Sequence, residues 1–244
     1  MSRDYKKTIV ILPGWDGSQQ TWQSFTDYAK NQNEFDFICL ELPCFGNQPC
    51  PDTVWGVKEY ASYVEKELGN LKITKPIILG HSFGGQVAAY LVAHNPDLVS
   101  KLILSGAPVI RTRKTLKRFV FKLIAKIGKG IFKIPGLNNF DSKAKKFLYK
   151  LTGSQDYNET SGIKREIYNK VNREDLKELI PLIKTKTLVI WGQNDTYVPV
   201  QVARKINKLL PNAQMKIFSN AKHGLHLQIP EDYYQAIINF IKEK

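Results

Sequence analysis

The chain has 244 residues, 43% of them apolar and 24% charged, which is enough for one large domain with an insertion or for two small domains. Its formal charge of +14 is uneven, because residues 107–184 hold 19 of the 36 Lys and Arg but only 7 of the 22 Asp and Glu. No run approaches the roughly 18 consecutive apolar residues that a membrane span needs. The first residues resemble a strand rather than a signal peptide, so we expect a soluble, cytoplasmic protein.

The three cysteines, Cys39, Cys44 and Cys50, fall within twelve residues of one another. An odd count without a repeated C-x-x-C unit or a nearby histidine argues against a disulfide framework and against a zinc site. The spacing permits a Cys44–Cys50 bridge. Reduced thiols are nevertheless the expectation for a cytosolic protein.

Apolar runs rich in Val, Ile and Leu alternate with helical patterns along the chain. The runs lie at 7–12, 35–42, 76–80, 100–106 and 187–191, with a weaker one at 214–218. The helical patterns lie at 54–68 (after Thr53 as a possible N-cap), 83–94, 199–210 and 231–242. Nearly continuous apolar strands are typical of strands covered on both faces. The alternation predicts an α/β fold with a parallel, doubly wound sheet.

The alternation breaks between the strands at 100–106 and 187–191, which are about 80 residues apart, far more than a usual connection of about 4–6 residues. This interval is the basic segment, and its composition is helical. We predict a core formed by residues 1–108 and 185–244. Residues 109–184 are predicted to form an inserted helical cap that ends in a helix over 173–184.

The stretch Gly80-His81-Ser82-Phe83-Gly84 lies where a predicted strand runs into a predicted helix. A sharp turn there holds a residue in strained geometry, and the flanking glycines keep neighbouring side chains away, so the Ser82 hydroxyl is exposed at the helix N-terminus. An ordinary glycine-rich turn with an incidental serine is the alternative. The strand before and the helix after favour a nucleophile.

A serine nucleophile needs a base, and a carboxylate must orient that base. Of the four histidines, His81 adjoins Ser82 and His94 ends the following helix, which leaves His223 and His226 after the last strand. His223 is favoured because Gly224 lets the loop turn. Asp195 follows the strand at 187–191, although a turn or cap role would also explain it. The order Ser82, Asp195, His223 matches one known architecture.

Two backbone N–H groups must stabilise the charge that develops on a carbonyl oxygen. Phe83, the first residue after the nucleophile, supplies one. The loop after the first strand, "LPGWDGS", supplies the other at Trp15, whose indole would line the acyl pocket or belong to the core. Asp16 is interpreted as a turn residue.

These motifs resemble the α/β-hydrolase superfamily, most of all its cap-bearing serine esterases. The matching stretches are LPGW (12–15), LPCFG (42–46), GHSFGG (80–85), LILSGAP (102–108), WGQND (191–195) and AKHGLHLQIPE (221–231). The resemblance implies Ser82 as nucleophile, His223 as general base and then acid, and Asp195 as its orienter. It also implies oxyanion donors at Trp15 and Phe83, with no metal and no cofactor.

Three features depart from the family pattern. Pro13-Gly14 stands where His-Gly is frequent in the oxyanion loop, and Cys44 stands where glycine is frequent. The first predicted strand lies close to the start of the sequence, so we expect the antiparallel strands that often precede it to be missing. This predicts a six-stranded, all-parallel sheet.

The leading functional hypothesis is a hydrolase of carboxylic esters. The alternatives are a lipase, lysophospholipase, thioesterase or acyltransferase on longer acyl chains, or a non-catalytic protein that binds through its basic cap. The basic positions recur at helical spacing and are Arg118, Lys122, Lys126, Lys129 and Lys133. The apolar positions on another face are Leu116, Val120, Leu123, Ile124, Ile127 and Ile131. Such a helix would serve as a lid, lie on an anionic membrane, or dock an acidic partner such as an acyl carrier protein. Nucleic acid is a poor fit, since the segment has no recognised binding fold.

Overall fold

The computed structural model describes residues 7–111 and 160–243. Residues 1–111 and 162–244 group into one compact unit, and Thr112–Ser161 group into a second. Within the predicted cap of residues 109–184, the stretch from Gly162 onward therefore groups with the sheet. The basic helical pattern over 116–133 lies outside the described residues.

The first unit is built on a six-stranded sheet in which every neighbouring pair is parallel, as the sequence predicts. The strand order is β2-β1-β3-β4-β5-β6. The strands are β1 (Thr8–Leu12), β2 (Asp36–Cys39), β3 (Ile77–His81), β4 (Lys101–Ser105), β5 (Thr187–Gly192) and β6 (Ala213–Phe218). The chain reverses its direction of winding at β1 and β3, so the carboxyl ends of these strands open a crevice suited to a site.

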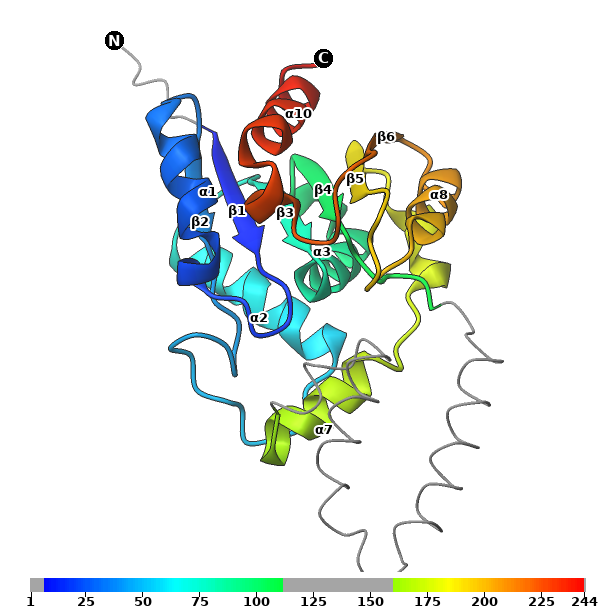
Figure 1. The fold of residues 1–244 in the computed structure, drawn as a ribbon. Coiled ribbons are helices and arrows are strands. Elements are labelled where there is room, and N and C mark those ends of the chain that lie inside the picture. Colours follow the sequence, from blue (N-terminus) through cyan, green and yellow to red (C-terminus); the bar gives the residue numbers. More distant parts are fainter. Residues whose placement is uncertain (1–6, 112–159, 244) are drawn as a thin grey trace, which may run out of the picture. The chain divides into compact units, whose positions relative to one another are not determined.

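Helices cover both faces of the sheet (Figure 1). Because successive strand residues point to opposite faces, each face has its own apolar layer. On one face, α2 (Val57–Asn70), α3 (Phe83–His94) and α8 (Val200–Leu209) pack with Val10, Ile78, Leu102 and Val189. On the other, α1 (Gln19–Asn31) and α10 (Pro230–Lys242) pack with Ile9, Ile77, Ile103 and Leu188. The remaining described elements are the helices α7 (Gly162–Val171) and α9 (Leu225–Gln228) and the 3₁₀ helices η1 (Pro96–Leu98) and η3 (Lys177–Leu182).

The helix predictions at 83–94, 199–210 and 231–242 are confirmed, while two others need correction. Helix α2 begins at Val57 with Gly56 rather than Thr53 as its N-cap, because Glu59 accepts the Gly56 N–H at 2.5 Å and Glu174 accepts the Val57 N–H at 3.0 Å. These carboxylates satisfy donors at the helix start, where negative charge is favoured.

The helix predicted over 173–184 is wrong. Only the short η3 forms there, and it contains Pro181. Proline has no N–H and its ring clashes with the preceding turn, so an α-helix does not extend through it. None of the helices within residues 7–111 and 160–243 is long and apolar enough to cross a membrane.

The expectation of reduced cysteines is corrected by a disulfide between Cys44 and Cys50, with Cα atoms 4.1 Å apart. Cys44 has φ 73°, and its N–H donates to the Pro49 carbonyl at 3.1 Å, which closes the loop into a compact turn. Cys39 is free and buried, and burial raises the pKa of its thiol to about 12. The prediction of a cytoplasmic protein loses the support it took from reduced thiols.

Thiol titration with an aromatic disulfide reagent checks this bond directly. Without reductant, the denatured protein is expected to show one reactive thiol, Cys39, and with prior reduction all three of its cysteines. Cys50→Ser should lower the free energy of unfolding by about 2 kcal/mol, since the bridge closes only a short loop in the unfolded chain. Three reactive thiols in the unreduced, denatured protein would contradict the bridge.

Candidate active site

The predicted nucleophile elbow lies where β3 ends and α3 begins. Ser82 is the N-cap of α3 and has φ 50° and ψ −118°, a conformation that residues other than glycine rarely adopt. Its N–H donates to the Ser105 carbonyl at 2.8 Å, which ties the turn to the end of β4. A strained residue held in this way is a common property of functional sites.

The glycines around Ser82 are needed for packing as well as for access. A Cβ atom on Gly84 would overlap the carbonyl oxygen of Leu12, and one on Gly80 would lie 2.6 Å from the Cα of Gly85. The Gly84 N–H instead donates to the Pro13 carbonyl at 3.0 Å. The elbow therefore packs directly against the loop that follows β1.

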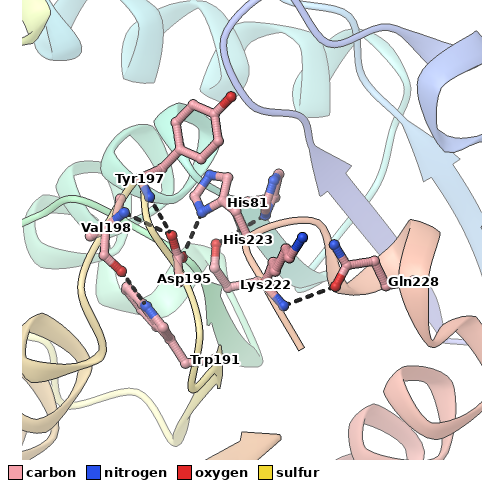
Figure 2. A network of polar contacts seen from close by, with 9 residues as sticks. His81, Trp191, Asp195, Tyr197, Val198, Lys222, His223 and Gln228 are labelled. Atoms are coloured by element: carbon pink, nitrogen blue, oxygen red, sulfur yellow. Dashed lines mark hydrogen bonds and ion pairs between the residues drawn. The ribbon is translucent and has the colours of Figure 1, made fainter. Parts of the chain in front are cut away.

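Asp195 and His223 are brought together by the loops after β5 and β6. Asp195 Oδ2 lies 2.6 Å from His223 Nδ1, and the Asp195 side chain is fully buried (Figure 2). Asp195 Oδ1 accepts the N–H groups of Tyr197 at 2.9 Å and Val198 at 2.8 Å. With Nδ1 donating to the carboxylate, His223 Nε2 is left as a proton acceptor.

The His223 ring faces the elbow. A Cβ on Gly106, which directly follows β4 and has φ 59°, would come within 2.9 Å of His223 Cε1. The ring of His81, the neighbour of Ser82, has its centroid 4.8 Å from that of His223. These contacts place the imidazole at the carboxyl ends of β3 and β4, next to His81 of the elbow.

Two backbone N–H groups near Ser82 are free to bind a ligand. Phe83 is the first residue of α3 and Trp15 lies in the loop after β1. In the part of the chain that the structure describes, neither N–H has a hydrogen-bond acceptor. A Cβ on Gly14 would lie 3.2 Å from the Ser82 Cβ, so this loop approaches the serine closely. The Trp15 indole packs edge-on against Phe45 and Phe83, with ring centroids 4.9 Å and 5.6 Å away.

His81 and His226 form a buried pair of histidines next to His223, which sequence reasoning did not foresee. His226 stacks on Trp22 with ring centroids 3.8 Å apart, and its centroid is 5.1 Å from that of His81. The His81 Nδ1 lies 3.2 Å from the Ser105 carbonyl oxygen. Burial is the larger cause and the nearby His223 the smaller cause that lower the pKa of His226 to about 4. Burial also holds the pKa of His81 well below its usual range.

This burial predicts a loss of stability in mild acid. A histidine with a usual pKa of 6.5 takes up a proton in the unfolded chain before it does so in the fold, so stability present above pH 6.5 is lost as the pH falls toward 4. Urea unfolding at pH 7 and pH 5 should show that His226 alone accounts for a loss of about 2 kcal/mol. His226→Phe keeps a ring on Trp22 and should remove that part of the loss. An unchanged pH dependence in this variant would contradict the explanation.

Sequence reasoning missed several residues that support the predicted Ser82, Asp195 and His223. The structure brings His223, not His226, to Asp195, and it leaves His94 stacked on Tyr90 at the far end of α3. Gly106 was missed, although a glycine after a buried strand is a usable signal. The Trp191 Nε1–H, which donates to the Val198 carbonyl at 2.9 Å and holds the Asp195 loop, has no signal in the sequence (Figure 2).

An all-parallel sheet with a strained serine after β3 and a His–Asp pair after its last two strands is the architecture of an α/β hydrolase. The chain belongs to this family, since the family of the alpha/beta hydrolase fold matches residues 7–124 and 136–230. No group of three or more His, Cys, Asp or Glu residues within 7–111 and 160–243 is arranged to hold a metal ion.

Several similar proteins are named as hydrolases or esterases. A 2-hydroxy-6-oxononadienedioate/2-hydroxy-6-oxononatrienedioate hydrolase of a Pseudomonas species is 21% identical, over 93% of this chain and 83% of the relative. The pimeloyl-[acyl-carrier protein] methyl ester esterase of Vibrio vulnificus CMCP6 is 20% identical, over 95% of this chain and 93% of the relative. The structure of an esterase from Exiguobacterium antarcticum superposes with a TM-score of 0.74 at 22% identity, covering 98% of this chain and 93% of the esterase. Together with the family, these relatives indicate a hydrolase.

Proposed function

We propose that this protein hydrolyses carboxylic esters through an acyl-enzyme formed on Ser82. The observation that carries the proposal is the combination of two features. Ser82 is held with φ 50° between β3 and α3, and His223 Nδ1 is bound to the buried Asp195 at 2.6 Å. A strained, accessible hydroxyl beside an oriented imidazole is the arrangement that activates a serine.

The reaction has two balanced halves. In the first, Ser82 Oγ attacks the ester carbonyl carbon while His223 Nε2 takes the hydroxyl proton, and the N–H groups of Trp15 and Phe83 stabilise the oxyanion. The leaving alcohol takes that proton from His223 and an acyl-serine remains. In the second, water attacks the acyl carbon and gives a proton to His223. The proton then returns to Ser82 Oγ as the carboxylic acid departs.

The experiment pairs covalent labelling with turnover. A fluorophosphonate probe should label the folded protein at one serine, and peptide mapping should assign the label to Ser82; heat-unfolded protein is the control and should not react. A series of p-nitrophenyl esters from acetate to palmitate should show an optimum that sizes the acyl pocket. Failure of the folded protein to label would favour a non-catalytic binding protein of this fold.

A second candidate is an esterase or acyltransferase whose acyl group is presented by an acidic carrier or an anionic lipid surface. It is favoured by the net basic charge of residues 107–184 and by the methyl ester esterase of Vibrio vulnificus, whose name gives an acyl carrier protein as part of its substrate. A rate on an acyl carrier ester that exceeds the p-nitrophenyl rate and falls steeply with salt would support it. Equal salt dependence for both substrates would argue against it.

A further inference from the structure

The loop after β1 is shaped by a tight turn over residues 14–17. The Gly17 N–H donates to the Gly14 carbonyl at 3.0 Å, and Asp16, the third residue of the turn, has φ 58°. Aspartate tolerates this left-handed conformation better than most residues. Trp15 is the second residue of this turn, so the direction of the Trp15 N–H depends on how firmly the turn is held.

Two side chains of α7 contact this turn. Lys164 and Tyr168 are four residues apart and so share a face of the helix. The Lys164 Nζ lies 2.5 Å from Asp16 Oδ1, and the Tyr168 ring lies edge-on to the Trp15 indole with centroids 4.9 Å apart. One helix thus contacts consecutive residues of the loop, one through charge and the other through an aromatic ring.

Helix α7 is itself anchored to the core. Ile167 and Val171, on an adjoining face, are 0% and 1% exposed and belong to the apolar layer that contains α2 and α3. Lys164 has a second restraint, since its Nζ lies 5.4 Å above the ring of Phe45, which also packs on Trp15. The contacts to the turn therefore come from a helix, α7, that is packed firmly on the core.

We propose that Lys164 and Tyr168 are positioning residues that hold the Trp15 N–H in the direction the oxyanion requires. This inference rests on the proposed ester hydrolysis. Neither side chain acts on the substrate; each acts through the loop. Since α7 starts immediately after the second unit, Thr112–Ser161, the inserted segment is joined covalently to the helix that sets the oxyanion donor.

A positioning role separates catalysis from stability. The Lys164 side chain is 21% exposed and that of Asp16 is 51% exposed. An ion pair so open to solvent contributes little to global stability. A small change in the direction of an oxyanion donor, in contrast, lowers the rate of the chemical step while the ground-state complex is hardly changed.

The test uses Lys164→Met, Asp16→Asn, the double variant and Tyr168→Leu, assayed on the best p-nitrophenyl ester. We expect each single change to lower kcat by about ten-fold with KM within two-fold of wild type. The double variant should be no slower than the slower of Lys164→Met and Asp16→Asn, because both remove the same contact. The Ki of a trifluoromethyl ketone, whose serine adduct carries the oxyanion, should rise by the same factor as kcat falls.

The matched control is Lys170→Met on the same helix. Lys170 pairs with Glu59 at 3.6 Å and donates to the Val54 carbonyl, away from the turn, and we expect kcat to stay within two-fold of wild type. Equal effects of Lys164→Met and Lys170→Met, or additive effects of the first two changes, would overturn the positioning role. If the wild-type protein neither labels at Ser82 nor turns over an ester, the proposed function fails instead, and the two failures are distinct.

Discussion

Replacing Ser82 by alanine is expected to lower kcat on the best p-nitrophenyl ester by about 10⁶-fold and to abolish fluorophosphonate labelling. The acyl-enzyme cannot form without the hydroxyl oxygen, so only the stabilisation by the Trp15 and Phe83 N–H groups would remain. The Ser82 side chain makes no capping hydrogen bond to α3, so its loss should leave the fold intact. Steady-state rates with urea unfolding of the same samples check both parts.

Ser82→Gly is a control that also removes the hydroxyl but relieves the backbone strain at this position. Glycine adopts φ 50° without the steric cost that alanine bears there, so Ser82→Gly should be at least as stable as Ser82→Ala. Both should be equally inactive. Residual turnover above a few per cent of wild type in either variant would rule out Ser82 as the nucleophile.

Asp195→Asn is expected to lower kcat by about 10⁴-fold. The asparagine oxygen would keep the two backbone donors of Tyr197 and Val198, so its NH₂ group would face His223 Nδ1. That contact reverses the tautomer: Nδ1 becomes the acceptor and Nε2 carries the proton, which leaves no base for Ser82. Rates on the same ester, with KM measured separately, should show the loss in kcat.

The adjacent Asn194 supplies the control for this loop. Its side-chain NH₂ donates to the Ser219 carbonyl at 3.3 Å rather than to His223. Asn194→Ala should therefore keep kcat within a few-fold of wild type. A loss of less than ten-fold in Asp195→Asn would assign Asp195 a role in loop structure rather than in orienting the base.

The sequence predicted the sheet well because its signals are local. All six strands form within two or three residues of the predicted runs, since buried parallel strands are nearly continuous in apolar residues. Helix α1 was missed, although Trp22, Phe25 and Ala29 recur at helical spacing on its buried face. The rest of its sequence, "QQTWQSFTDYAKN", is mostly polar. The mean hydropathy of the segment is therefore low, and few apolar residues mark the helical period.

The candidate site was predictable to the extent that each residue follows a strand. Ser82, Asp195 and His223 stand at the ends of parallel strands, and those ends meet at one edge of the sheet, so their proximity follows from the topology. Contacts from outside this pattern were not predictable. The Lys164–Asp16 pair joins residues 148 positions apart, and only the packing of α7 brings them together.

The disulfide shows a different limit. The spacing of Cys44 and Cys50 permitted a bridge, but composition alone favoured free thiols. Whether two cysteines six residues apart can pair depends on the path of the chain between them. Here the turn at Cys44 and its hydrogen bond to Pro49 bring Cys50 back to Cys44. No single residue in the sequence indicates that geometry.

The pairing of β4 with β5 has a consequence for how this protein can change. The two strands are hydrogen-bonded neighbours, with Leu102 opposite Thr187, yet about 80 residues separate them in sequence. The entropy of closing such a loop grows only with the logarithm of its length, by about 0.6 kcal/mol for each doubling. We therefore expect the β4–β5 pairing to tolerate a longer or shorter insert between Arg111 and Gly162, because its free-energy cost changes little with length.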